Sequence, residues 1–326
     1  MKSKYAILLI MCGILAFYQS CKKKEDPIKH PFGLFPENLV NLYDLNTKLD
    51  DSNISEHIIQ GNISIIFSNS AQSTVNLEQG ALTYLFDKTN GEFRSAFNKT
   101  NDVFTKSLID KATAQGRISV PYRFFCKTDG FEYFIYSSEN SGGKSDFFYM
   151  KYMPMTGATV QGPYPITLLN SANNDSYISF DQDFTTIYFS SDRDGKYNIY
   201  SHPILQTSSQ TSLSEQFDKP FTTSVKLDEV NSDGNDMCPF VYKNVMVFAS
   251  DNLGGFGGFD LYYSVLRDGK WSAPINFGPN INTEFDEFLP ILGSVTDFKN
   301  SYLIFSSNRE GKAEFDLYFT GITLPK

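Results

Sequence analysis

Residues 189 to 200 read Phe-Ser-Ser-Asp-Arg-Asp-Gly-Lys-Tyr-Asn-Ile-Tyr, and this stretch predicts a β-hairpin. The apolar run from Thr186 to Phe189 is typical of a buried strand, and the run from Tyr197 to Tyr200 is typical of the returning strand. Between them Asp194 and Gly195 form a pair that turns easily, because both residue types tolerate a positive φ. The same pattern recurs along the chain.

Five copies of this hairpin align on their first aromatic residue. They begin at Phe67, Tyr136, Phe189, Phe248 and Phe305, and their returning strands reach Tyr84, Tyr149, Tyr200, Tyr262 and Tyr318. One such unit cannot bury its apolar faces alone, so repeats at a long period indicate stacked units, as in solenoids and propellers. The intervals leave no room for an additional blade of about 40 to 50 residues. The sequence therefore predicts an all-β fold, a five-bladed β-propeller of four-stranded antiparallel blades.

Each hairpin also needs an inner strand before it and an outer strand after it. We predict the outer strands at residues 104–109, 164–169, 222–227 and 273–277. The fifth copy ends too close to the C-terminus for an outer strand of its own. We expect Asn38 to Tyr43 to supply that strand and to close the ring by pairing the N-terminal strand with the last blade.

Two stretches fit the repeat poorly. Residues 101–116 suit either a strand followed by a loop or a short helix that is capped by Asn101 and ended by Gly116, and periodicity alone does not decide between them. Residues 206–216 are rich in Ser, Thr and Gln, which indicates a polar hairpin tip in the third blade.

The start of the chain resembles a bacterial lipoprotein. Lys2 and Lys4 precede an apolar run that is too short for a membrane span and fits a secretory signal. Cys21 follows this run directly, as the acylated cysteine of such lipoproteins does, and an ordinary signal followed by a free cysteine is the alternative. We therefore expect a signal peptide at 1–20, a tether at 21–37 and the propeller at 38–326. Residues 24–26, Lys-Glu-Asp, resemble an export signal to the surface of the outer membrane, so we expect an outer-membrane lipoprotein exposed on the cell surface.

A Cys21→Ala variant is expected to move from the membrane fraction to the soluble fraction of the native host. Each buried acyl methylene contributes roughly 0.8 kcal/mol, so several chains would hold the protein on a membrane and their loss would release it. Immunoblotting of the two fractions checks this. A variant that stays with the membrane would contradict the anchor.

Composition narrows the classes of function. Aromatic residues make up 15% of the chain, which favours strands, and the formal net charge of -9 argues against a nucleic-acid partner. Cys126 and Cys238 fall in non-adjacent repeats, so we expect two buried thiols and no disulfide. No His and Cys spacing suits zinc, and the turn glycines precede no helix that could bind a phosphate. We therefore predict neither a metal nor a cofactor.

Acidic residues stand near the starts of four predicted inner strands. They are Glu56, Asp175, Asp236 and Glu287, with Arg117 at the corresponding place in the second blade. Because inner strands start around one mouth of the central channel, these acids could form an electronegative ring that binds a basic peptide or a cation. The alternative is that each acid accepts hydrogen bonds from backbone N–H groups of its own turn.

Two longer stretches point to a family. Residues 248–262 read Phe-Ala-Ser-Asp-Asn-Leu-Gly-Gly-Phe-Gly-Gly-Phe-Asp-Leu-Tyr, and residues 267–277 read Arg-Asp-Gly-Lys-Trp-Ser-Ala-Pro-Ile-Asn-Phe. Both resemble the TolB-like propeller repeats (PD40 repeats, which are WD40-like) of bacterial envelope proteins. The resemblance implies a monomeric domain that is not an enzyme and that binds an envelope protein or peptide as a scaffold.

Two other classes of function stay open at this point. One is a glycoside hydrolase, because such enzymes need two carboxyl groups about 5 to 9.5 Å apart, which Glu56, Asp236 and Glu287 could supply. The other is glycan binding by exposed aromatic side chains, for which Tyr242, Tyr302 and Trp271 are candidates.

Overall fold

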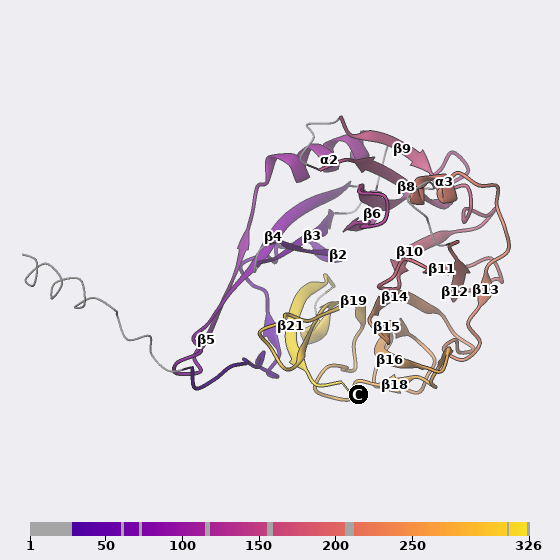
Figure 1. Ribbon diagram of the computed structural model, residues 1–326. Coiled ribbons are helices and arrows are strands. Elements are labelled where there is room, and N and C mark those ends of the chain that lie inside the picture. Colours follow the sequence, from indigo (N-terminus) through magenta and orange to yellow (C-terminus); the bar gives the residue numbers. More distant parts are fainter. Residues whose placement is uncertain are drawn as a thin grey trace, which may run out of the picture.

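The computed structural model describes residues 28–59, 62–71, 74–114, 118–154, 159–205, 212–311 and 313–324. Five antiparallel sheets are arranged in a ring, with one sheet per predicted repeat (Figure 1). The prediction of an all-β, five-bladed propeller is therefore confirmed. In the described part of the chain, helix is confined to α2, α3 and one 3-10 turn.

Each blade contributes strands in order from the centre of the ring outward. Blade 1 contains β2 (Asp50–Ile59), β3 (Asn62–Ala71), β4 (Thr74–Phe86) and β5 (Phe93–Lys99). Blade 2 contains β6 (Ile118–Phe125), β7 (Glu132–Glu139), β8 (Ser145–Tyr152) and β9 (Gln161–Pro165). Blade 3 contains β10 (Asp175–Phe180), β11 (Thr186–Ser191), β12 (Asn198–Pro203) and β13 (Val225–Lys226).

The last two blades depart slightly from this plan. Blade 4 contains β14 (Asp236–Tyr242), β15 (Val245–Ser250) and β16 (Asp260–Arg267), and both β17 (Lys270–Trp271) and β18 (Ile275–Asn276) pair with β16. Blade 5 contains β19 (Glu287–Gly293), β20 (Ser301–Ser307) and β21 (Asp316–Ile322), and its outer strand is β1 (Val40–Asn41).

The ring closes as the sequence predicts, by pairing of the two ends of the chain. Val40 pairs with Phe319 and Asn41 with Tyr318 in antiparallel register. The Leu42 amide N–H extends this pairing by donating to the Leu317 carbonyl at 2.9 Å.

Contacts with the ring begin before residue 38. Gly33 forms an isolated parallel bridge with Phe298, and the Phe35 ring stacks on the Phe298 ring with centroids 4.0 Å apart. Phe35 is buried and also meets Tyr84 of blade 1 and Phe319 of blade 5 edge to face. The N-terminal segment therefore packs into the seam between the first and last blades.

Residues 101–116 contain a helix, α2 (Val103–Thr113), so the predicted outer strand at 104–109 is wrong. Asp102 caps this helix, and not Asn101, because its carboxylate accepts a hydrogen bond from the Thr105 amide at 2.7 Å. Leu108, Ile109 and Ala112 lie at helical spacing and bury one face of α2. Gly116 lies outside the described residues.

The predicted polar tip at residues 206–216 is partly wrong. Residues 206–211 lie outside the described part of the chain, but α3 (Leu213–Phe217) follows them and Ser212 caps it. Leu213 and Phe217 are buried against blades 2 and 3, which explains why a short polar stretch folds there.

The inner strands share one irregularity. In every blade the register between the first and second strands shifts near the start of the first strand, after two paired residues in blades 2 to 5 and after three in blade 1. Four of these shifts contain a non-glycine residue with positive φ, and these residues are Val120, Tyr177, Cys238 and Leu289. Such a conformation is uncommon for side chains of this kind, and the bulge directs them toward the axis of the ring. Both Cys126 and Cys238 are free, buried thiols, as predicted.

Candidate functional site

The described inner strands converge on a small cavity at the centre of the ring. Side chains from β6, β10, β14 and β19 leave a cavity of about 30 Å³ lined by Val120, Tyr122, Tyr177, Cys238, Phe240 and Leu289 among others. A ligand pocket usually measures about 300 to 1,000 Å³, whereas a water molecule occupies about 30 Å³ of liquid. This cavity between the described inner strands therefore has no room for a sugar or a peptide.

Three of the predicted acids start inner strands and are fully buried. Asp175, Asp236 and Glu287 are the first residues of β10, β14 and β19. Each carboxylate accepts hydrogen bonds from the amide and the hydroxyl of the residue four positions earlier. Those residues are Ser171, Ser232 and Thr283, at 2.6 to 2.9 Å. The acids therefore hold the turns that enter the inner strands, which was the alternative to a binding ring.

In blade 1 the corresponding acid is Asp51, which the sequence analysis missed. Its carboxylate accepts from the Thr47 amide at 2.5 Å and from the Thr47 hydroxyl at 3.2 Å. The sequence contains a pattern that identifies Asp51, because Thr or Ser stands four residues before the acid in all four blades. Glu56 lies further along β2, where it pairs with Ile65. Arg117 lies outside the described residues.

Two arginines neutralise two of these acids. Arg193 donates to Asp175 at 2.6 Å, and Arg309 donates to Glu287 at 3.2 Å. The arginine side chains are themselves only 13% and 11% exposed. The geometry thus gives the acids a structural role, and a ligand-binding role for them stays a prediction. Among the described residues, no group of three or more His, Cys, Asp or Glu could hold a metal ion.

The exposed-aromatic alternative fails for two of its three candidates. Tyr302 is fully buried and Trp271 is 7% exposed, because both pack into blade cores. Tyr242 is partly exposed, and its hydroxyl lies 2.6 Å from the Ser294 hydroxyl.

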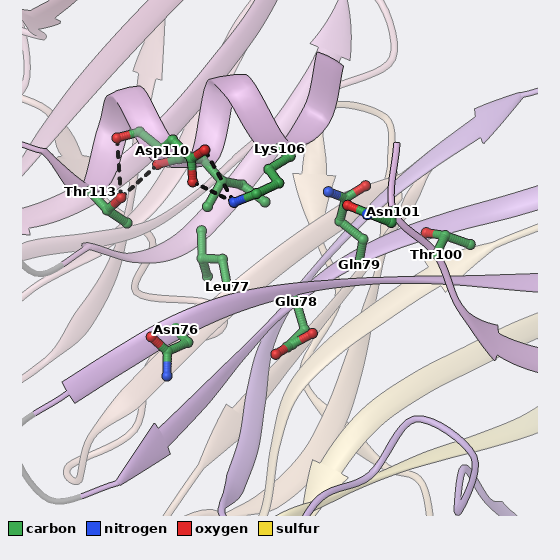
Figure 2. Close-up of a pocket in the computed structure, with 10 residues that line it drawn as sticks. Asn76, Leu77, Glu78, Gln79, Thr100, Asn101, Lys106, Asp110 and Thr113 are labelled. Carbon is green, nitrogen blue, oxygen red and sulfur yellow. Dashed lines mark hydrogen bonds and ion pairs between the residues drawn. The ribbon is translucent and has the colours of Figure 1, made fainter. Parts of the chain in front are cut away.

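A polar groove of about 350 Å³ lies on blade 1, away from the channel. Figure 2 shows Lys106, Asp110 and Thr113 on α2, whereas the side chains of Asn76 and Glu78 point from β4 away from the helix. The remaining lining residues are Leu77, Gln79, Thr100, Asn101 and Ile109. The groove is therefore a space of ligand size that is lined mainly by polar residues.

The groove exists because β5 does not cover the first residues of β4. β5 pairs with β4 only over Gly80–Phe86, and the Thr100 amide makes the last contact with the Gln79 carbonyl at 2.9 Å. The chain then turns into α2, and Gln79 fixes the start of that helix by accepting from the Asp102 amide at 3.0 Å. The helix thus lies beside the part of β4 that β5 leaves uncovered.

The two acids of the groove differ in their surroundings. Asp110 is exposed and pairs with Lys106 one helical turn earlier, with nitrogen to oxygen distances of 2.9 and 3.1 Å. Glu78 is half-buried on β4, opposite Phe67 of β3. Sequence reasoning missed both residues, because the weak first repeat gave no signal for an interrupted outer strand.

Comparison with solved structures places this fold among glycoside hydrolase propellers. A thermostable family-43 glycoside hydrolase matches at 12% identity over 85% of this chain and 91% of its own, with a TM-score of 0.57. A family-43 enzyme from Xanthomonas citri, solved with xylose, matches at 10% identity over 87% and 89%, with a TM-score of 0.53. An exo-1,5-alpha-L-arabinanase from a bovine ruminal metagenomic library matches at 11% identity over 85% and 94%, with a TM-score of 0.52. No protein-family model and no curated protein matches the sequence.

These neighbours correct three predictions. The resemblance to TolB-like repeats finds no support, because the similar structures are glycoside hydrolases and no family model matches. The same structures overturn the prediction of a non-catalytic protein-binding scaffold and the prediction that the chain is not an enzyme. The residues behind the resemblance build hairpins and turns, which propellers of different function share. Within the described residues, no helix is long and apolar enough to cross a membrane.

Proposed function

We propose that this chain is a glycan-directed propeller whose ligand lies in the groove between β4 and α2. The observation that carries the proposal is an open groove of about 350 Å³ that is lined mainly by polar residues of β4, α2 and the segment between β5 and α2. Sugar hydroxyls both donate and accept hydrogen bonds, so they suit a lining of this kind. The cavity of about 30 Å³ between the described inner strands is too small for the same purpose.

The similar structures support a pentose-containing glycan. They include an arabinanase and an enzyme solved with xylose. The probes of choice are therefore short arabino- and xylo-oligosaccharides, with cello-oligosaccharides as a hexose comparison. A groove of this volume accommodates one or two sugar rings.

Hydrolysis of a glycosidic bond is the second candidate function, because Glu78 and Asp110 line the same groove. Glycosidases use two carboxyl groups on either side of the scissile bond, one as acid and one as base or nucleophile.

Glu78→Gln and Asp110→Asn are each expected to weaken glycan binding at least tenfold, which is about 1.4 kcal/mol at 25 °C. Titration calorimetry with arabinotriose and xylotriose measures the affinity, and release of reducing sugar measures hydrolysis. If the pair is catalytic, each variant should also lose about 100-fold or more in turnover.

Glu92→Gln is the matched control, because Glu92 is an exposed acid of the same blade whose partner is Arg94, outside the groove. It should leave binding unchanged. Equal affinity in the wild type and both groove variants would place the glycan elsewhere. Failure of every oligosaccharide to bind would reject the proposed function. The anchor at Cys21 and the outer-membrane location stay proposals.

A further inference from the structure

Blades 3 and 5 each hold an arginine in a site built from the same partners. In blade 3, Arg193 donates through Nη2 to Asp175 Oδ1 at 2.6 Å and to the Leu169 carbonyl at 3.2 Å. Its Nε donates to the Ser191 hydroxyl at 2.9 Å. Three acceptors thus surround one guanidinium group.

Two aromatic rings complete this site. The guanidinium carbon of Arg193 lies 5.1 Å from the ring centroid of Phe189 and 4.9 Å from that of Tyr200. Such distances allow a cation–π attraction. Blade 5 repeats the whole arrangement with Arg309, Glu287, Ser307, the Ile281 carbonyl and the rings of Phe305 and Tyr318.

Blade 4 has the partners of this site in the same register. Asp236 pairs with Ser250 as Asp175 pairs with Ser191, and Phe248 pairs with Tyr262 as Phe189 pairs with Tyr200. The Phe248 and Tyr262 rings stack with centroids 6.1 Å apart. The position of the arginine, two residues after the serine, is occupied by Asn252.

Because blade 4 lacks this arginine, one carboxylate oxygen of Asp236 has no guanidinium partner. Asp236 Oδ2 accepts from the Ser232 amide at 2.6 Å and the Ser232 hydroxyl at 2.9 Å, as Asp175 Oδ2 does with Ser171. Asp236 Oδ1, the counterpart of the oxygen that binds Arg193, accepts no hydrogen bond of standard geometry, although burial raises the pKa of Asp236 and the nearby Ser250 hydroxyl opposes that rise. Leaving a buried acceptor without a full hydrogen bond costs free energy, so a donor that reaches this oxygen would bind favourably.

Two further polar groups lie around the same place. Asp260 Oδ1 is buried without a hydrogen-bond partner, and the buried Tyr262 hydroxyl lies near the Asn276 side chain. Burial raises the pKa of Tyr262, the Asn276 side chain opposes that rise, and the charges of Asp260 and Asp236 add to it. The surroundings are therefore more electronegative than in blade 3, where Asn198 stands at the position of Asp260.

The charged neighbour Lys196 donates its hydrogen bonds to groups other than Asp236 Oδ1. Lys196 binds the Ser232 and Gly234 carbonyls at 2.5 and 3.0 Å, so its ammonium group is engaged beside Asp236 and not on it. Leu253 packs against the Phe248 and Tyr262 cluster and is the side chain that an incoming group would displace. Asn252, Gly254 and Gly255 are exposed, so the loop over the site presents little bulk.

We propose that blade 4 contains a binding site for a guanidinium group supplied from outside the chain, either as an arginine side chain or as a small alkylguanidinium. Val230 stands two residues before Ser232, as Leu169 stands two residues before Ser171, so its carbonyl is the counterpart of the Leu169 carbonyl. The donor would meet Asp236 Oδ1, the Ser250 hydroxyl and the Val230 carbonyl, and it would lie over Phe248 and Tyr262. This proposal is independent of the glycan groove, which lies on blade 1.

Titration calorimetry with agmatine and with acetyl-arginine-amide tests the site. Both should bind the wild type, and acetyl-citrulline-amide, which has the same shape without the charge, should bind at least tenfold more weakly. Preference for the amide over agmatine would identify a peptide arginine as the source, and the reverse would identify a small molecule.

Two variants assign the binding to blade 4. Asn252→Arg should fill the site from within, raise the melting temperature and abolish binding of both probes. Asp236→Asn should weaken binding at least tenfold while keeping the acceptor for Ser232. Unchanged probe binding in Asn252→Arg would overturn the proposal. Calcium binding that depends on Asp236, with no response to either probe, would overturn it in favour of a metal site.

Discussion

Arg309→Ala is expected to lower the free energy of unfolding by about 3 to 5 kcal/mol, because it leaves a buried carboxylate without its counter-charge. Glu287 is fully buried, and Arg309 supplies both the ion pair at 3.2 Å and a 2.7 Å hydrogen bond to the Ile281 carbonyl. Its guanidinium also covers the rings of Phe305 and Tyr318. Urea denaturation followed by tryptophan or tyrosine fluorescence measures the loss.

The control for this variant is Lys106→Ala. Lys106 and Asp110 form an exposed pair, 56% and 59% accessible, and such a pair is worth at most about 0.5 kcal/mol. Agmatine added to Arg309→Ala should restore part of the lost stability, because the variant creates the vacancy that blade 4 has naturally. A loss below about 1 kcal/mol for Arg309→Ala would mean that the ion pair does not hold blade 5 together.

Asp51→Asn is expected to remove a pH dependence of stability. Burial raises the pKa of Asp51 from 3.8 to about 6, against the lowering effect of the hydrogen bonds from Thr47. A carboxyl whose pKa is higher in the folded state stabilises the fold when protonated and loses that contribution as pH rises from about 4 to 6. Each unit is worth about 1.36 kcal/mol, so the wild type should lose about 2 to 3 kcal/mol relative to Asp51→Asn between pH 4 and pH 7.

Chemical denaturation of both proteins at half-unit pH steps measures this difference. The other buried carboxyls with raised pKa values, Asp236, Asp260 and Glu287, are present in both proteins and cancel in the comparison. The asparagine can still accept from the Thr47 amide, so the turn should persist. A constant stability difference across the range would show that Asp51 does not titrate within it.

The repeat predicted the fold because its most regular positions are also its most buried ones. Phe67, Phe189, Phe248 and Phe305 are fully buried on the second strands of their blades, so apolar burial and sequence period coincide. Gly195, the glycine of the quoted hairpin turn, has the positive φ that the pattern required. Ring closure followed from the missing outer strand, and β1 supplies it.

The candidate sites were harder to predict, because they occur where the repeat is broken. The groove exists only because α2 replaces a continued outer strand in blade 1, and helix and strand were indistinguishable by periodicity there. The guanidinium site exists because Asn252 replaces the arginine of blades 3 and 5. This difference becomes meaningful only once the contacts of Arg193 and Arg309 are known. The repeated acids, by contrast, were predicted as a site because they recur, but they recur because the blades share the same turn.

The antiparallel pairing of β1 with β21 fixes an order of events in folding. Asn41 and Tyr318 are paired neighbours, yet the chain between them includes all of blades 1 to 4. Contacts between residues so distant in sequence form slowly, because the intervening loop must close first. Blades 1 to 4 can assemble in sequence as the chain emerges, but Phe35 and β1 must wait for the last residues to arrive. The seam between blades 1 and 5 is therefore expected to be the last part of the ring to form and the place where a protease would meet an open edge.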